Sequence, residues 1–164
     1  MSAEAIDVDE HWMSQALVLA DQAEALGEVP VAALVVVDGQ IAGRGHNRNI
    51  LDRDPSAHAE IVALRAAGIA LGNHRLVRAT LYCTLEPCLM CIGAMIHARI
   101  ARLVFAADDP KTGAVGSVFD PLGDTRHNHQ IDVVRGVLQL EASARMQAFF
   151  RRKRSEDKER RTRG

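Results

Sequence analysis

The sequence has no hydrophobic run long enough to cross a membrane, and its first residues do not follow the pattern of a secretory signal. Its longest apolar stretches, residues 29–37 and 88–96, fall far short of the roughly 18 to 20 residues that a membrane-spanning helix requires. The N-terminal segment is rich in Asp and Glu, whereas a signal peptide starts with basic residues and continues with an apolar segment. We therefore expect a cytoplasmic protein with no membrane partner.

Cysteine is also scarce, because the chain contains three such residues, Cys83, Cys88 and Cys91. An odd number does not suit a disulfide framework, and two of the three lie only three positions apart. This usage is typical of a reducing compartment and of metal or redox chemistry. Cys83 lies in a predicted strand, and we expect it to be a buried, inert thiol.

The length and composition are those of one ordinary globular domain. The 164 residues are 48% hydrophobic and 25% charged, which excludes a disordered or fibrous protein. No internal repeat or linker divides the chain, so we predict a single domain over residues 1–164. The net charge is -1, but residues 151–164 carry eight Lys and Arg against three Asp and Glu. Such a basic run is typical of the solvated end of a helix, and we predict a basic helical tail there.

Hydrophobic periodicity predicts strands that alternate with helices. The pair Asp38-Gly39 indicates a hairpin turn, although two glycines disfavour the strand that follows it. Asp54 and Pro55 have the pattern of a helix cap and a first turn. The predicted helices cover residues 9–26, 54–70, 88–98 and 138 onward; the predicted strands cover residues 29–37, 41–46, 79–85, 101–106 and 131–134, with a long loop at 108–129. This alternation favours a three-layer α/β fold.

Cys88 and Cys91 lie at a predicted helix start, where residues three positions apart share one face. Both sulfurs can therefore meet one ion, and the helix N-terminus favours the negative charge of the thiolates that bind metal. The same arrangement is also typical of thioredoxin-like redox motifs. The pair alone leaves metal binding and redox chemistry equally open.

His58 and Glu60 change this balance, because they also lie at a predicted helix start, about 30 residues upstream. Two strands that are each followed by a helix bring the two helix N-termini to one end of a sheet. His58, Cys88 and Cys91 would then converge on one metal ion. The remaining histidines do not belong to such a group of potential ligands and are more typical of packed or surface residues.

Three protein ligands leave one tetrahedral position for water, which is typical of catalytic zinc, whereas structural zinc has a fourth protein ligand. Zinc lowers the pKa of a bound water to about 7 and so supplies a nucleophile near neutral pH. Glu60 could take the proton of this water, give it to a ring nitrogen of a substrate and later protonate departing ammonia. The residues therefore predict hydrolytic deamination.

The same residues carry a resemblance to a known family. Residues 58–60 (His-Ala-Glu) and 87–91 (Pro-Cys-Leu-Met-Cys) match the signature of the zinc-dependent cytidine and nucleobase deaminase superfamily. Over roughly residues 10–152 the chain further resembles the bacterial tRNA-specific adenosine deaminases. This longer resemblance rests on residues 47–48, 54–60, 84–91, 93–97 and 109–114.

The resemblance implies a three-layer cytidine deaminase-like fold with a five-stranded mixed sheet flanked by helices. It also implies one zinc ion per chain, no organic cofactor, a homodimer, and conversion of adenosine to inosine at the wobble position of the arginine tRNA anticodon. Glu60 would be the general acid and base. Asn47 and the Ala59 backbone would contact the flipped base, while the loop with Asp109 and Lys111 would lie against the anticodon loop.

Two rival functions remain open at this point. A deaminase of free bases or nucleosides would share the metal chemistry, and a redox dithiol module would share Cys88 and Cys91.

The family that the chain resembles usually has Gly at the position of Ala32, and the extra methyl group is expected to tighten the substrate pocket slightly.

Some residues near the expected pocket also allow simpler roles. Asp109 could cap a turn instead of contacting RNA. Met146, Phe149 and Phe150 have the helical spacing of core or dimer packing, although the two rings precede the cations of the tail and could instead stack on RNA bases.

Overall fold

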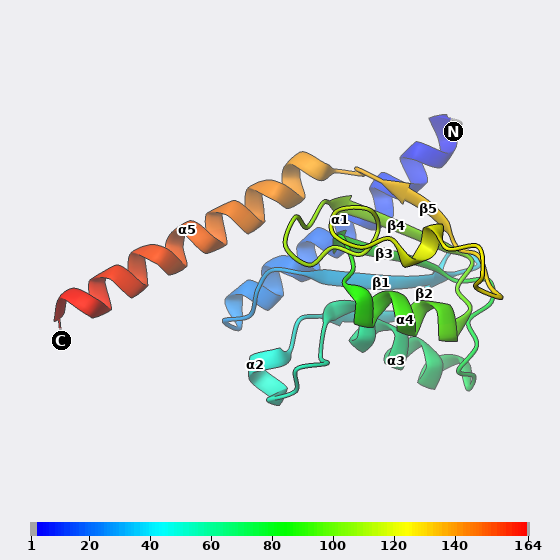
Figure 1. Ribbon diagram of the computed structural model, residues 1–164, viewed down its shortest axis with the longest axis horizontal. Coiled ribbons are helices and arrows are strands. Elements are labelled where there is room, and N and C mark those ends of the chain that lie inside the picture. The colour runs from blue at the N-terminus through cyan, green and yellow to red at the C-terminus, as the bar shows by residue number, and fades with distance from the viewer. Residues whose placement is uncertain (1–2, 164) are drawn as a thin grey trace.

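The computed structural model describes residues 3–163, which form a five-stranded sheet with helices on both faces (Figure 1). The strands are β1 (Ala32–Val37), β2 (Gln40–His46), β3 (Thr80–Leu85), β4 (Arg102–Ala107) and β5 (Asp132–Arg135). The helices are α1 (Ala3–Ala25), α2 (Asn49–Asp52), α3 (Ala59–Leu71), α4 (Leu89–Ala98) and α5 (Gln139–Arg163), with a 3-10 turn η1 (Pro121–Gly123). None of the helices in this range is both long and apolar enough to cross a membrane.

The strand order is β2-β1-β3-β4-β5, which confirms the predicted mixed sheet of five strands. β1 is antiparallel to β2 and β3, whereas β4 is parallel to β3 and β5. Ala32, at the start of β1, pairs with His46 at the end of β2, and its N–H donates a hydrogen bond to Thr84 near the end of β3. β2 and β3 therefore end at the same edge of the sheet, and the chain continues from them toward α3 and α4.

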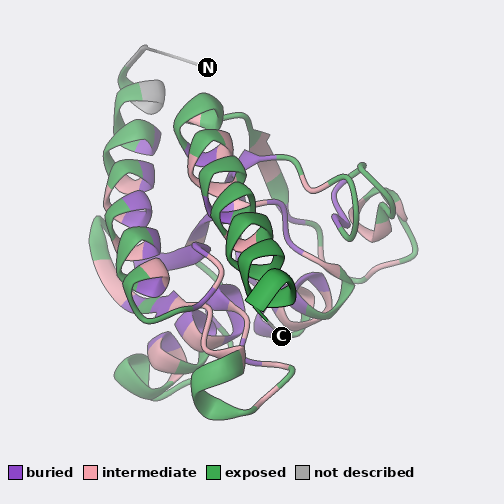
Figure 2. Ribbon diagram, turned by 90° about the vertical axis from the view of Figure 1, so that its left-hand side faces the viewer, coloured by how far each residue is buried: buried purple, intermediate pink, exposed green. Residues whose placement is uncertain are grey.

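Two apolar clusters fill the space between the sheet and its helices. α3 and α4 cover one face with residues such as Leu64 and Ile92. α1 and the first turns of α5 cover the other face, where Met13, Ala142 and Leu34 of β1 belong to one buried cluster. The inward sides of these helices are buried, whereas the C-terminal half of α5 is exposed (Figure 2). α5 therefore runs on beyond the body of the molecule.

The hairpin between β1 and β2 has the predicted turn. Asp38 and Gly39 have φ angles of 49° and 72°, both in the left-handed region. Two successive left-handed residues form the turn that matches the twist of paired strands, which is why Asp-Gly favours it. The Asp-Gly signal is thus confirmed.

Gly43 and Gly45, the two glycines that disfavoured β2 in the sequence, lie directly beneath α3. A Cβ atom at Gly43 would clash with the backbone oxygen of Ala63, and one at Gly45 would clash with that of Ala59. The glycines are therefore required by the close approach of α3 to β2, an approach that also places the first turn of α3.

The predicted helix from residue 54 is wrong in its first turn, because α3 begins at Ala59. Asp54 Oδ1 accepts hydrogen bonds from the backbone N–H and the hydroxyl of Ser56, at 2.8 and 2.7 Å. These bonds close a local turn instead of capping a helix. His58 is the N-cap residue of α3, with an extended backbone, and Glu60 lies in the first turn.

The segment between β2 and α3 contains the short helix α2, which was not predicted. The first N–H groups of a helix have no partner within it. In α2 the N–H groups of Ile50 and Leu51 donate to Glu28 Oε1, each at 2.8 Å, and the Glu28 side chain is buried. This cap comes from 22 residues upstream of Ile50, so the local sequence gives no sign of it.

Two further boundaries differ from the prediction. α1 begins at Ala3, six residues earlier than predicted, with the acidic Glu4 in its first turn, where the helix dipole favours negative charge. β1 begins at Ala32 instead of residue 29. Pro30 has no N–H for a strand ladder, and the Val31 N–H is bonded to the oxygen of Val29 in a local turn.

Candidate metal centre and pocket

Three potential metal ligands from two helix N-termini meet at one edge of the sheet. His58 is the N-cap residue of α3, Cys88 is that of α4, and Cys91 lies in the first turn of α4. His58 Nδ1 is 3.5 Å from Cys88 Sγ and 3.6 Å from Cys91 Sγ, and the two sulfur atoms are 3.7 Å apart. The structure therefore brings together the three residues that the sequence predicted would converge.

These separations fit a tetrahedral zinc ion. Zn–S bonds of about 2.3 Å and a Zn–N bond of about 2.0 Å, at tetrahedral angles, place two sulfur atoms about 3.8 Å apart and a sulfur and a nitrogen about 3.5 Å apart. The three separations within the cluster agree with these values. His58 and Cys88 line a pocket, so a fourth ligand position would face that pocket.

The electrostatics of the cluster favour a thiolate at Cys88, whereas the hydrogen bond with Cys88 and burial raise the pKa of Cys91. The hydrogen bond with Cys91 lowers the pKa of Cys88 to about 4, and the neighbouring His58 adds to this effect against the opposing effect of burial. The hydrogen bond with Cys88 in turn raises the pKa of His58. The thiolate is the form of cysteine that binds metal. The His-Cys-Cys group could therefore hold a metal ion.

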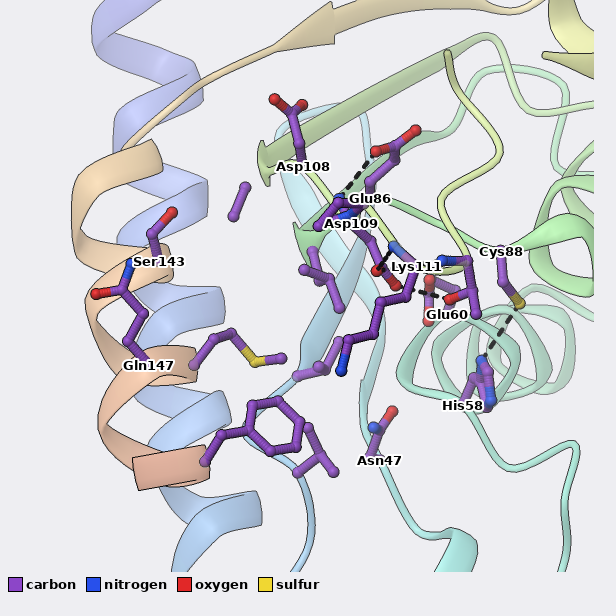
Figure 3. A pocket seen from close by; sticks show the side chains of 18 of the residues that line it. Asn47, His58, Glu60, Glu86, Cys88, Asp108, Asp109, Lys111, Ser143 and Gln147 are labelled. Carbon is purple, nitrogen blue, oxygen red and sulfur yellow. Dashed lines mark hydrogen bonds between the residues drawn. The ribbon is translucent and has the colours of Figure 1, made fainter. Parts of the chain in front are cut away.

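A pocket of about 730 Å³ opens beside the cluster (Figure 3). Its walls come from the segment before β1, the segment after β2, the end of β3, the N-termini of α3 and α4, the loop after β4, and α5. Asn47, His58, Glu60 and Cys88 lie on one side of it, and side chains of α5 lie on the other. This volume lies within the range of small-molecule binding sites.

Glu60 lines this pocket and is 3% exposed. Burial raises the pKa of its carboxyl group to about 7, although the charge of His58 acts in the opposite direction. A general acid and base works best when its pKa lies near the working pH. Glu60 is therefore suited to accept and return a proton next to the metal cluster.

Asn47 is held at the pocket by the first turn of α3. Its Oδ1 accepts a hydrogen bond from the Ala59 N–H at 3.0 Å. Because the oxygen is used in this way, the NH₂ group of Asn47 is the part left to donate to a molecule in the pocket. The N–H of Ala59 is occupied by this bond, and Ala59 is not among the described residues that line the pocket.

Asp109 and Lys111 line the pocket on the loop after β4. Asp109 Oδ1 accepts a hydrogen bond from the Lys111 N–H at 2.9 Å, and its Oδ2 accepts one from the Thr112 hydroxyl at 2.7 Å. Asp109 thus caps a turn, the simpler of the two roles considered for it. Lys111 Nζ lies 5.9 Å from the centre of the Phe150 ring of α5, which indicates a cation–π contact across the pocket.

The two phenylalanines of α5 differ in their surroundings. Phe149 is buried, as core packing predicts, and its ring meets that of Phe150 edge to face at 5.3 Å between centroids. Phe150 is 41% exposed and lines the pocket together with Met146. The ring of Phe150 therefore forms part of the pocket wall and is available to a bound molecule.

Glu86 is a second buried carboxylate of the pocket, and no sequence pattern pointed to it. It accepts hydrogen bonds from the N–H groups of Asp109, Val115 and Ser117 and from the Ser117 hydroxyl. Burial acts to raise its pKa, but these hydrogen bonds outweigh burial and the pKa is lowered. A Cβ atom at Gly113 would clash with the carboxyl group, so the loop wraps directly around it. The partners lie 23 to 31 residues downstream, and local sequence gives no signal for them.

Two other buried residues do not line the pocket. Ala32 is fully buried, and its methyl group belongs to the core instead of the pocket wall. Cys83 is also fully buried, and burial raises its pKa well above the ordinary value, so the thiol stays protonated. The predicted burial of Cys83 is confirmed.

The mixed sheet and the His-Cys-Cys group at two helix N-termini define a deaminase with a cytidine deaminase-like fold. A solved tRNA:A34 deaminase, studied for A-to-I editing at the wobble position of transfer RNA, is 44% identical with a TM-score of 0.79 and is matched over 82% of this chain and 98% of that chain. Guanine deaminase from Nitrosomonas europaea is 30% identical with a TM-score of 0.75, over 85% and 83% of the two chains.

Sequence comparisons narrow this class further. The MafB19-like deaminase family matches residues 7–154. The tRNA-specific adenosine deaminase of Haemophilus influenzae is 52% identical over 153 residues, which is 93% of this chain and 88% of that protein. The tRNA-specific adenosine deaminase of Bacillus subtilis is 45% identical over 150 residues, 92% and 93% of the two proteins. The chain belongs to the family of tRNA-specific adenosine deaminases.

Proposed function

We propose that this enzyme hydrolyses adenosine to inosine at the wobble position of tRNA, in the anticodon of an arginine tRNA. The arrangement of His58, Cys88 and Cys91 beside Glu60 carries the proposal. Three potential ligands with tetrahedral spacing, next to a buried carboxyl group, provide what zinc-dependent deamination requires. The identity with tRNA-specific adenosine deaminases supports adenosine in tRNA as the substrate.

The chain's own residues supply the proton transfers of this reaction. His58, Cys88 and Cys91 would hold one zinc ion per chain, which lowers the pKa of a water molecule enough to supply hydroxide near neutral pH. Glu60 would accept a proton from the attacking water and give it to N1 of adenine; it would then take the proton of the new C6 hydroxyl and give it to the departing amino group. Oxygen ends on C6 and the amino group leaves as ammonia, so no organic cofactor is required.

The pocket wall would hold the flipped base. Asn47 offers its NH₂ group to the base, while the Ala59 backbone N–H holds the Asn47 oxygen and so orients the amide. The turn capped by Asp109 holds Lys111 at the pocket, where its cation would face the anticodon loop. The exposed ring of Phe150 adds a surface on which a base could stack.

We also infer that the enzyme is a single domain that works in the cytoplasm and that, as its family resemblance implies, it forms a homodimer. Light scattering of the purified protein tests the dimer. A mass close to twice the chain mass of 17.9 kDa is expected, and a mass equal to one chain would contradict it.

A substrate panel tests the proposed reaction. The purified enzyme is given an anticodon stem-loop with adenosine at the wobble position and, separately, free adenosine, guanine and cytosine, and ammonia is measured. Ammonia and inosine are expected from the stem-loop alone. Release from the small molecules alone would overturn the proposal in favour of a free-base deaminase, the activity named for the Nitrosomonas europaea protein.

Metal analysis separates the deaminase from a redox dithiol module. About one zinc ion per chain is expected, and Cys88→Ser should lose both the zinc and the turnover. Cys83→Ala is the matched control, because this third thiol lies in β3 outside the pocket and its loss should leave zinc in place. A metal-free protein that reversibly forms a Cys88–Cys91 disulfide would contradict the zinc site.

A further inference from the structure

Helix α5 sorts its basic residues onto two faces. Four of them form ion pairs with acidic residues of α1 or of α5 itself: Arg145, Arg152, Lys153 and Arg160. Four others, on a different face, form no ion pair within residues 3–163: Arg151, Arg154, Lys158 and Arg161. We call these four residues the basic stripe.

The basic stripe continues the side of α5 that lines the pocket. At about 100° per residue, its four members fall within an arc of about 80° around the helix axis. Ser143, Gln147 and Phe150, which line the pocket, lie on nearly the same arc. Arg151 and Arg154 themselves also line the pocket. One face of α5 therefore leads from the pocket outward as a row of four cations.

The outer part of this row stands clear of the body of the molecule. The buried residues of α5 are Ala142 and Phe149, and the helix beyond them is largely exposed (Figures 1 and 2). At 1.5 Å per residue, Arg161 lies about 16 Å farther along the helix than Phe150. Asp157 borders the stripe, but it pairs with Arg160 on the other face. The stripe thus extends well past the space that a single nucleoside could fill.

We propose that the basic stripe binds phosphate groups of the substrate RNA outside the nucleotide that enters the pocket. This inference rests on the proposed function. A polynucleotide that places one base in the pocket must carry its backbone out of it, and Arg151 and Arg154 of the stripe line that pocket. Its regularly spaced negative charges match a row of unpaired cations, and neutralising each phosphate releases counterions. α5 thereby favours RNA over a free base.

Two double variants test the stripe against the same charge on the other face. Lys158→Gln/Arg161→Gln removes the outer half of the stripe. Lys153→Gln/Arg160→Gln, the matched control, also removes one Lys and one Arg from α5, but from the ion-paired face. None of the four residues lines the pocket, and Gln is about as favourable in a helix as Lys and Arg. Circular dichroism verifies that the helix content is unchanged.

The measurement is the binding of zinc-loaded enzyme to an anticodon stem-loop with inosine at the wobble position, a product that does not react further. Fluorescence anisotropy gives Kd over a range of salt concentrations. The stripe variant should bind about tenfold more weakly, and its log-log salt slope should be smaller by about 1.4 to 1.8, as for two phosphates no longer neutralised. The control should keep a slope close to that of the unsubstituted enzyme.

The outcomes separate the stripe from the proposed function. If the log-log salt slope decreases equally in both double variants, or in neither, the proposed role of the basic stripe is wrong. This holds even though the enzyme converts a stem-loop with adenosine. If the unsubstituted enzyme neither converts nor binds the stem-loop, the proposed function fails and the stripe fails with it. A smaller slope in the stripe variant, with kcat on saturating stem-loop unchanged, supports both.

Discussion

Glu60 and Glu86 both line the pocket and are almost equally buried, with 3% and 2% of their surface exposed, yet their surroundings differ. The pKa of Glu60 is raised to about 7 by burial. The pKa of Glu86 is lowered, because four hydrogen bonds from the loop after β4 outweigh its burial. Burial alone therefore does not decide what a carboxyl group does. Glu86 stays charged and braces a loop, whereas Glu60 can gain and lose a proton.

Asp9 is a third buried carboxylate, and it lies on the opposite face of the sheet. Its carboxylate is 1% exposed and accepts two hydrogen bonds from the Arg102 guanidinium, both at 2.7 Å, and one from the Tyr82 hydroxyl at 3.0 Å. It is braced like Glu86 but lies outside the pocket. Asp9 therefore separates the effect of losing a buried charge from the effect of disturbing the pocket.

The largest effect is expected for Glu60→Gln. The amide keeps the size of the side chain but cannot shuttle a proton, so turnover of the stem-loop should fall about 10³-fold. Inosine formation under single-turnover conditions measures this, and metal analysis should find zinc retained. A variant with near-normal turnover would show that Glu60 is not the proton shuttle.

A smaller effect is expected for Glu86→Gln. The neutral amide is a weaker acceptor than the carboxylate, so the free energy of unfolding should fall by about 2 kcal/mol. The loop with Asp109 and Lys111 should loosen, which raises KM for the stem-loop more than it lowers kcat. Asp9→Asn is the matched control, with a similar loss of stability in urea denaturation and an unchanged KM. If both variants raise KM equally, Glu86 contributes general stability and does not position the loop.

The smallest effects on stability are expected for two glycine substitutions, one in β2 beneath the first turn of α3 and one in α4. Gly45→Ala should lower the free energy of unfolding by about 1 to 2 kcal/mol, because its Cβ would push against the backbone of α3. Gly93→Ala, in α4, meets no atom within 4 Å and should raise stability by about 0.5 to 1 kcal/mol. Urea denaturation compares the two. Equal stabilities would show that the close packing of α3 on β2 is not needed.

The metal cluster could be predicted from sequence because its information is local. Cys88 and Cys91 are one helical turn apart, His58 starts another helix, and the strand–helix order brings the two helix starts to one edge. The depth of the pocket also depends on α5, and its contribution was predicted only in part. Helical spacing correctly indicated core packing for Phe149, but it did not distinguish the neighbouring Phe150, which the helix turns toward the pocket.

The remaining features depend on partners far along the chain. α2 is capped by Glu28, and the loop after β4 is organised by Glu86. Gly43 and Gly45 disfavour a strand by themselves and are explained by the helix packed against them. Local propensity is a weak guide at such positions, because the interactions that fix them form only once distant segments have come together.

α5 is one continuous helix from Gln139 to Arg163, and this continuity gives its charges a fixed geometry. A flexible tail of the same composition would spread its cations over many distances from the pocket. A helix instead fixes the distance of each cation from the pocket and its angle around the helix axis. Adding or removing one residue after Phe150 would leave the charge nearly the same but rotate Lys158 and Arg161 by about 100°, out of line with the pocket.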